Sequence, residues 1–175
     1  MRNKVFRLSG VLSLVLTSQA FSGIEWGVNG GMTYRPGYNN GSYDMSGGIG
    51  FPVAGLTAYS KGKGVSLKSY LEYSKFKLTY PAPYNSDATQ KVYMWSTFLL
   101  TSFMGLQMGV GGGVGYEKTF YGSVLGHSYA GISLNYEIAQ NLSIDTRTLV
   151  EVGGIEIWKR WVTLVTVNFL IFPSN

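Results

Sequence analysis

Few side chains in this sequence are of the types that carry out catalysis or hold metal ions. The chain has no cysteine and a single histidine, His127, so thiolate ligands and histidine pairs for zinc are missing. His127 is followed by Ser128, and adjacent residues of a strand point to opposite faces, which prevents a direct proton relay between them. We therefore expect no enzymatic activity, no metal site and no cofactor.

Charged residues make up only 13% of the chain, and several fall on the polar face of predicted strands. Buried charges must pair or meet water, so they predict a salt-bridge network that plugs a narrow interior. The alternative is a charged constriction that lines a small ion-conducting pore. The predicted luminal network consists of Glu117, Glu137, Asp145, Arg147, Glu151 and Arg160.

The first 20 residues predict a secretory signal peptide rather than a folded element. A basic start is followed by an apolar run from Leu8 to Leu16 and by Ser18-Gln19-Ala20, a pattern that a signal peptidase cleaves. The domain would then comprise residues 21–175. The signal holds three of the 14 Lys and Arg residues, so 11 remain against nine acidic residues, a net charge of +2. This weak charge gives no reason to expect a nucleic-acid partner.

Alternation of apolar and polar residues recurs from Ile24 to Phe172 and predicts an all-β chain. Pro52 cannot donate to a sheet ladder, which predicts a local bulge, and a change of parity between Leu71 and Phe76 predicts a second one. The eight predicted strands fall at about 24–33, 43–59, 65–80, 92–104, 106–118, 130–138, 142–151 and 160–171.

The connections alternate between long polar loops and tight turns. The longer ones lie at about 35–42, 81–91 and 119–127, with a shorter one at 152–156, and the turns lie at 60–64, near Gly105 and at 140–141. This alternation predicts an antiparallel up-and-down barrel. Residues 92–116 carry no charge and have the length of a spanning helix, but their glycines favour a hairpin.

Large aromatic residues near strand ends indicate which way the barrel faces. A membrane barrel exposes its apolar face to lipid, with tyrosine and tryptophan at the two interfaces, whereas a soluble lipocalin-like barrel buries its apolar face. The character of the two faces favours the transmembrane barrel. The predicted aromatic girdle consists of Trp26, Tyr34, Tyr43, Tyr59, Tyr80, Tyr93, Trp158 and Trp161.

With its signal peptide, eight strands, three tight turns and aromatic final strand, the chain resembles the small eight-stranded outer-membrane barrels of the OmpA/OmpX type. That resemblance implies a structural or surface-interaction role in the outer membrane of a Gram-negative envelope. It implies outer-membrane lipid, lipopolysaccharide and the envelope assembly machinery as partners, and loops 35–42 and 81–91 would contact an extracellular ligand. A lipid-modifying outer-membrane enzyme is a further alternative, since some similar barrels trim the acyl chains of lipids. Family members commonly end on an aromatic residue, whereas here Phe172 is followed by Pro173-Ser174-Asn175.

Overall fold

The computed structural model describes residues 22–39, 44–45, 48–62, 64–79, 87–118, 124–152 and 161–172. No helix within these ranges is long and apolar enough to cross a membrane. The predicted signal peptide, and the predicted site residues Tyr43, Tyr80, Trp158 and Arg160, lie outside the described residues.

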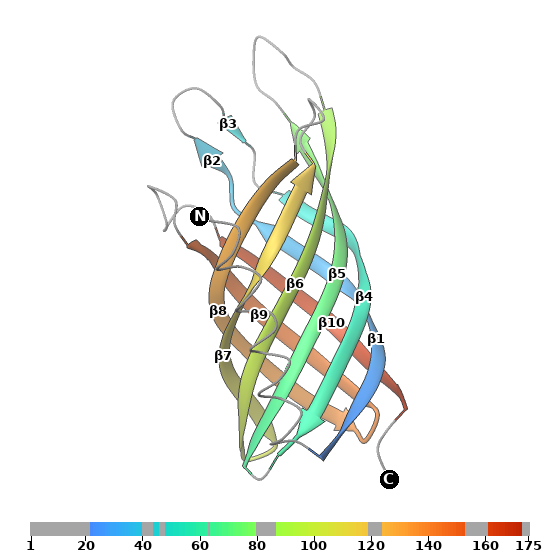
Figure 1. Cartoon of the computed structure of the whole chain (residues 1–175). Coiled ribbons are helices and arrows are strands. Elements are labelled where there is room, and N and C mark those ends of the chain that lie inside the picture. The colour runs from blue at the N-terminus through green and yellow to red at the C-terminus, as the bar shows by residue number, and fades with distance from the viewer. Residues whose placement is uncertain are drawn as a thin grey trace.

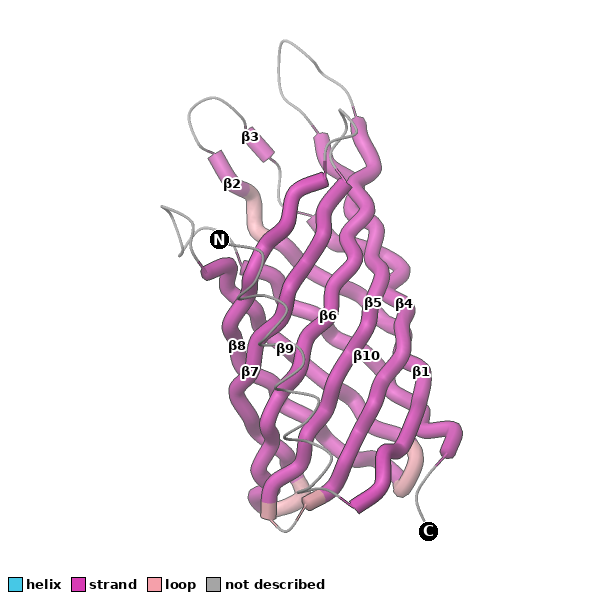
Figure 2. Tube along the Cα trace, viewed as in Figure 1, coloured by secondary structure: helices cyan, strands magenta, loops and turns pink. Residues whose placement is uncertain are grey.

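Eight antiparallel strands close into a barrel, which confirms the predicted fold (Figures 1 and 2). Each strand pairs with its neighbours in the chain, and β1 closes the barrel against β10. Residues 92–116 therefore belong to two strands joined at Met104-Gly105, not to a helix. The barrel strands are β1 (Ser22–Arg35), β4 (Gly48–Lys61), β5 (Val65–Thr79), β6 (Asp87–Phe103), β7 (Leu106–Lys118), β8 (Val124–Ala139), β9 (Leu142–Val152) and β10 (Trp161–Phe172).

The turns that join β6 to β7 and β8 to β9 lie at one end of the barrel, the short-turn end (Figure 1). The strand ends that border the longer connections of the sequence lie at the other end, the long-loop end. Between β1 and β4 lies a small hairpin of β2 (Tyr38–Asn39) and β3 (Asp44–Met45), which sequence reasoning did not predict. Several strands reach further toward the long-loop end than expected. Residues 87–91 of the predicted second loop begin β6, and residues 124–127 of the third begin β8.

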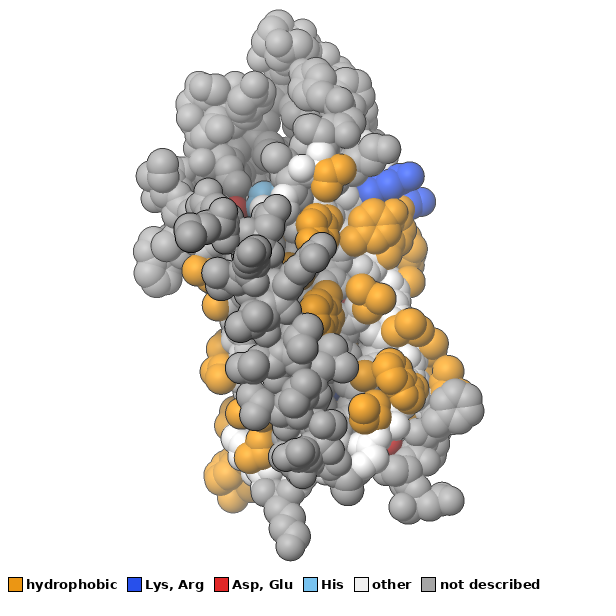
Figure 3. Space-filling model, in the orientation of Figure 1, with side chains coloured by type: hydrophobic (Ala, Val, Ile, Leu, Met, Phe, Trp, Pro, Cys, Tyr) orange, Lys and Arg blue, Asp and Glu red, His pale blue; other side chains and the backbone are white. Residues whose placement is uncertain are grey.

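Inward and outward side chains alternate along each strand, and the apolar face is the outer one. Trp26, Val165 and Phe169 are 52%, 40% and 47% exposed on the outside of the barrel. Figure 3 shows apolar side chains spread over the part of this outer surface that it describes. The buried polar residues on the inner face include Asn29, Thr57, Lys68, Glu72, Ser133, Asn135, Asp145, Arg147, Thr166 and Asn168.

The strand irregularity predicted at Pro52 is confirmed. The pairing of β4 with β5 shifts register between Gly50 and Val53, and the Phe51–Pro52 peptide bond is cis. The second predicted bulge, between Leu71 and Phe76, is wrong, because β5 pairs with β6 in unbroken register from Val65 to Thr79. The apparent change of parity arises because Phe76 is an apolar residue that points into the barrel, where it is 3% exposed.

The inward-facing glycines of β7 bring this strand close to the bulky residues of its neighbours. A methyl group on Gly111 would collide with the carbonyl oxygen of Thr97 and would lie 2.8 Å from the Phe98 ring. At Gly115 it would lie 2.8 Å from the ring of Tyr129. The glycines thus make room for aromatic rings inside a narrow barrel.

Candidate functional site in the barrel interior

A fully buried ion pair lies near the middle of the interior. The Arg147 guanidinium donates to both carboxylate oxygens of Glu72, at 2.8 and 2.6 Å, and donates a further bond to Thr166. The central carbon (Cζ) of the guanidinium also lies 3.7 Å from the centre of the Tyr70 ring. Since the two partners come from β9 and β5, the pair bridges the interior rather than linking adjacent strands.

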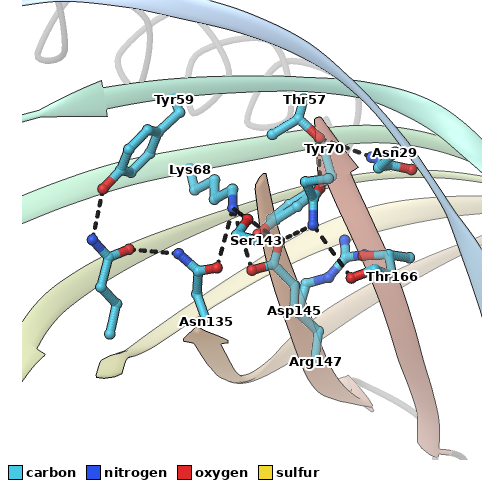
Figure 4. A network of polar contacts seen from close by, with 12 residues as sticks. Asn29, Thr57, Tyr59, Lys68, Tyr70, Asn135, Ser143, Asp145, Arg147 and Thr166 are labelled. Atoms are coloured by element: carbon cyan, nitrogen blue, oxygen red, sulfur yellow. Dashed lines mark hydrogen bonds and ion pairs between the residues drawn. The ribbon is translucent and has the colours of Figure 1, made fainter. Parts of the chain in front are cut away.

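A second buried pair, Lys68 with Asp145, lies beside the first (Figure 4). The Lys68 ammonium lies 3.0 Å from the Asp145 carboxylate and also donates to Ser143 and Asn135. Asp145 accepts two further bonds, from the Tyr70 hydroxyl and from the Asn168 amide. A buried charge is stable only when its remaining hydrogen-bonding capacity is used, and the contacts of Lys68 and Asp145 meet that condition.

Toward the short-turn end the network continues through uncharged groups to the rim. Gln107 donates to the Tyr59 hydroxyl at 2.6 Å and to the Glu137 carboxylate at 3.1 Å, and it accepts from Asn135. Tyr59 was predicted in the outer girdle, and this is wrong: its ring is 2% exposed and points inward. The register shift at Pro52 changes the parity of β4, so Tyr59 shares the inner face with Val53 and Thr57.

Apolar side chains separate these central pairs from the long-loop end. Along β9, Leu149 lies between Arg147 and Glu151, and along β6, Met94 and Val92 lie between the inward residues Ser96 and Gln90. The buried apolar layer on this side consists of Val53, Phe76, Val92, Met94, Leu149 and Val162. A cavity of about 20 Å³ adjoins it, enough for about one water molecule.

A third group of charges lies beyond the apolar layer. His127 is placed between two carboxylates, with Nδ1 2.8 Å from Glu151 and Nε2 3.3 Å from Glu117. Arg35 approaches Glu117 at 3.4 Å and also donates to Gln90. Of the predicted luminal residues, Glu117, Asp145, Arg147 and Glu151 are buried inside, and Glu137 lies at the more exposed rim. The His127 ring contacts the carboxylates of Glu117 and Glu151.

The predicted girdle residues that the structure describes, other than Tyr59, face outward or are partly exposed. Trp26, Tyr34 and Tyr93 are about half exposed, and Trp161 packs its ring against that of Tyr34. The described part of the chain contains no group of three or more acidic, histidine or cysteine residues that could hold a metal ion.

Two residues central to the interior, Lys68 and Glu72, were not predicted from the sequence. The pattern does hold a signal for them, since Lys68, Tyr70 and Glu72 share one face of β5 while Leu67, Leu71 and Tyr73 lie on the other. The sequence does not show which acid pairs with which base, because the partners are about 75 residues apart in the chain. Their pairing depends on how the sheet closes.

Comparison with known proteins finds similarity of fold but not of sequence. No family model matches the chain, and no curated protein matches its sequence. It resembles the outer-membrane protein Ail of Yersinia pestis in a phospholipid bilayer nanodisc, with a TM-score of 0.53 at 11% identity. That match covers 83% of this chain and 97% of Ail. A crystal structure of Ail with the heparin analogue sucrose octasulfate gives a TM-score of 0.46 at 13% identity, over 84% and 97% of the two chains. The chain has the fold of the small eight-stranded outer-membrane β-barrels.

Proposed function

We propose that the protein is an integral outer-membrane barrel whose interior is closed and whose long loops act at the cell surface. The observation that carries this proposal is the distribution of side chains. Apolar residues such as Trp26, Val110 and Phe169 are exposed around the outside, while Arg147 and Asp145 are fully buried within. This arrangement suits a barrel surrounded by lipid and would leave a large apolar surface in water.

A closed interior fits the arrangement of its layers better than a pore does. An ion that moved along the barrel axis would have to break the buried pairs Arg147–Glu72 and Lys68–Asp145 and then cross the apolar layer. Apolar constrictions exclude water and ions. Eight-stranded barrels are also narrow enough for side chains to fill them. The interior therefore acts as a rigid plug.

The long-loop end is the surface-facing end in this proposal, because outer-membrane barrels carry short turns on the periplasmic side and longer loops outside. The predicted loop 35–42 and the part of the predicted loop 81–91 that precedes β6 would contact an extracellular ligand, since loops on a rigid scaffold commonly carry recognition. Lipid and lipopolysaccharide would surround the barrel, and the envelope assembly machinery would insert it after export.

Gel mobility tests whether the protein is a membrane barrel. We expect unboiled protein from the outer-membrane fraction to migrate differently from boiled protein, because a closed barrel stays folded in cold detergent. Recovery from the soluble periplasmic fraction with no shift on heating would instead support a soluble binding barrel.

Cysteine labelling tests the orientation of the barrel in the membrane. The sequence has no cysteine, so only the introduced residue can react with the label. We expect Asn40→Cys, in loop 35–42, to react with a membrane-impermeant maleimide on intact cells. Lys61→Cys, at the turn between β4 and β5, should react only after the outer membrane is permeabilised. The opposite pattern would reverse the proposed orientation.

Conductance separates the plug from the pore. Purified protein in planar bilayers should show no conductance steps, whereas a channel-forming barrel reconstituted in the same way should. Regular single-channel steps, absent from matched samples without protein, would establish the pore instead.

A further inference from the structure

Lysines form a row across three neighbouring strands at the long-loop end. Lys75 of β5 lies directly opposite Lys91 of β6, and Lys91 lies directly opposite Lys118 of β7. The side chains of Lys75 and Lys91 are exposed on the outer face. Like charges in directly opposed cross-strand positions repel each other, so an arrangement of this kind is unfavourable unless an anion lies between them.

No acidic residue occupies a position directly opposite a lysine of this row. The backbone opposite Lys75 on its other side is the Phe51–Pro52 bulge of β4, and the residue opposite Lys118 on β8 is Val124. Glu72 and Glu117, which lie on β5 and β7, point into the barrel. The register therefore places no acidic residue directly beside Lys75 or Lys91 on the neighbouring strands.

Tyrosines form a matching row one step below. Tyr73, Tyr93 and Tyr116 are opposite one another on β5, β6 and β7, and the rings of Tyr73 and Tyr93 lie 5.1 Å apart. Tyr93 and Tyr116 are 51% and 54% exposed. The Lys75 ammonium lies 5.9 Å from the centre of the Tyr73 ring. Tyrosine with its apolar body and polar hydroxyl is stable at the boundary between hydrocarbon and headgroups.

The length of β6 places the two rows at that boundary. Outward residues of β6 run from Tyr93 to Phe103, about ten residues. At about 3.3 Å per residue and a tilt of about 40°, this distance spans about 25 Å along the barrel axis, the height of the apolar band of such barrels. Lys91 then lies just above the hydrocarbon. On the face drawn in Figure 3, Lys and Arg side chains gather beside the upper part of the apolar surface.

We infer that the opposed pair Lys75–Lys91, with the tyrosine row below it, binds the phosphate groups of a phosphorylated lipid in the outer leaflet. The tyrosines would lie against its upper acyl region while the ammonium groups neutralise its phosphates. This inference rests on the proposed outer-membrane location and adds to it a defined site and a ligand chemistry. The ligand is a membrane lipid rather than a soluble polyanion, because Lys75 and Lys91 lie one step above the outward-facing tyrosines.

A lipid-retention assay tests this inference. The protein is refolded in phosphatidylcholine micelles that contain a trace of diphosphoryl lipid A or of dephosphorylated lipid A, and the lipid retained by the purified protein is measured. We expect the wild type to retain the phosphorylated form preferentially. Lys75→Gln/Lys91→Gln should reduce this retention about fivefold for each lysine replaced, since one lysine near an anionic surface contributes about that factor.

Two control variants make the result specific. Lys61→Gln/Lys63→Gln removes the same charge at the turn between β4 and β5 and should retain lipid A as the wild type does. Lys75→Arg/Lys91→Arg keeps the charge and should also retain it. Equal retention of phosphorylated and dephosphorylated lipid A, or an equal loss in the turn variant, would overturn the inference.

Two further outcomes distinguish other failures. A soluble sulfated polysaccharide that binds the wild type but not Lys75→Gln/Lys91→Gln, with lipid retention unchanged, would overturn the lipid assignment in favour of a soluble partner. If the protein inserts into phosphatidylcholine vesicles and shows a heat-dependent gel shift but retains no lipid A, only this inference fails. If it does not insert at all, the proposed membrane location fails with it.

Discussion

The two oxygens of Glu72 hold a guanidinium group that has no access to solvent. We predict that Glu72→Ala lowers the free energy of unfolding by about 3–5 kcal/mol, because it leaves Arg147 buried without its acidic partner. Urea titration of the refolded protein in lipid vesicles, followed by tryptophan fluorescence, measures this loss.

Two matched variants show whether burial is the cause. Lys61 and Glu137 are 3.9 Å apart at a partly exposed rim, so Lys61→Ala should lower the free energy of unfolding by less than about 1 kcal/mol. Replacing both buried charges, as in Glu72→Leu/Arg147→Met, should recover part of the stability that Glu72→Ala loses. A loss in Glu72→Ala no larger than that in Lys61→Ala would show that the buried pair contributes little.

At the scale of single elements, β7 depends on glycine where it passes the aromatic residues of β6. We predict that Gly111→Ala lowers the free energy of unfolding by about 1–3 kcal/mol, because the new methyl group meets the Thr97 carbonyl and the Phe98 ring. Gly30→Ala is the control, since its methyl group would lie 3.7 Å from the nearest atom, the Val53 carbonyl oxygen. The same vesicle-based titration compares them, and equal stability of both variants would contradict this account.

Alternation of apolar and polar residues predicted the eight barrel strands. It could not show which side chains point inward where both faces of a strand are apolar or where a bulge shifts the alternation. β6 carries Val92, Met94 and Phe98 inside and Tyr93, Trp95 and Leu99 outside, so both of its faces are apolar. In β4 the irregularity at Pro52 was predicted, but its effect on parity was not. This is why Tyr59 was assigned to the outer face.

The interior could be predicted in kind but not in its pairings. Asp145, Arg147 and Glu151 alternate along β9, and this local pattern indicates a charged inner face. Their partners depend on contacts across the closed barrel, which a one-dimensional pattern does not contain. The buried apolar layer was not predicted either, since Val53 and Phe76 look like lipid-facing residues in the sequence.

At the scale of the whole molecule, the decisive property is an apolar outer surface whose surroundings change with depth. Val110 of β7 is 65% exposed, and Val124 of β8 is 64% exposed. Val110 lies about six residues below Tyr116, close to the middle of an apolar band about 25 Å high. Val124 lies opposite Lys118, above that band. The same residue type with the same exposure therefore occurs at two depths.

We predict that Val110→Arg lowers the free energy of unfolding in lipid vesicles by about 2–4 kcal/mol, whereas Val124→Arg lowers it by about 1 kcal/mol or less. A charge at the bilayer midplane loses its hydration, while one at the interface keeps it. In a water-soluble barrel both positions would be ordinary surface sites, and each change would stay within about 0.5 kcal/mol. Reversible urea unfolding of the two variants in the same vesicles separates these cases. Equal, small effects would mean that lipid does not surround the middle of the barrel, and the membrane-spanning function would have to be abandoned whatever the interior contains.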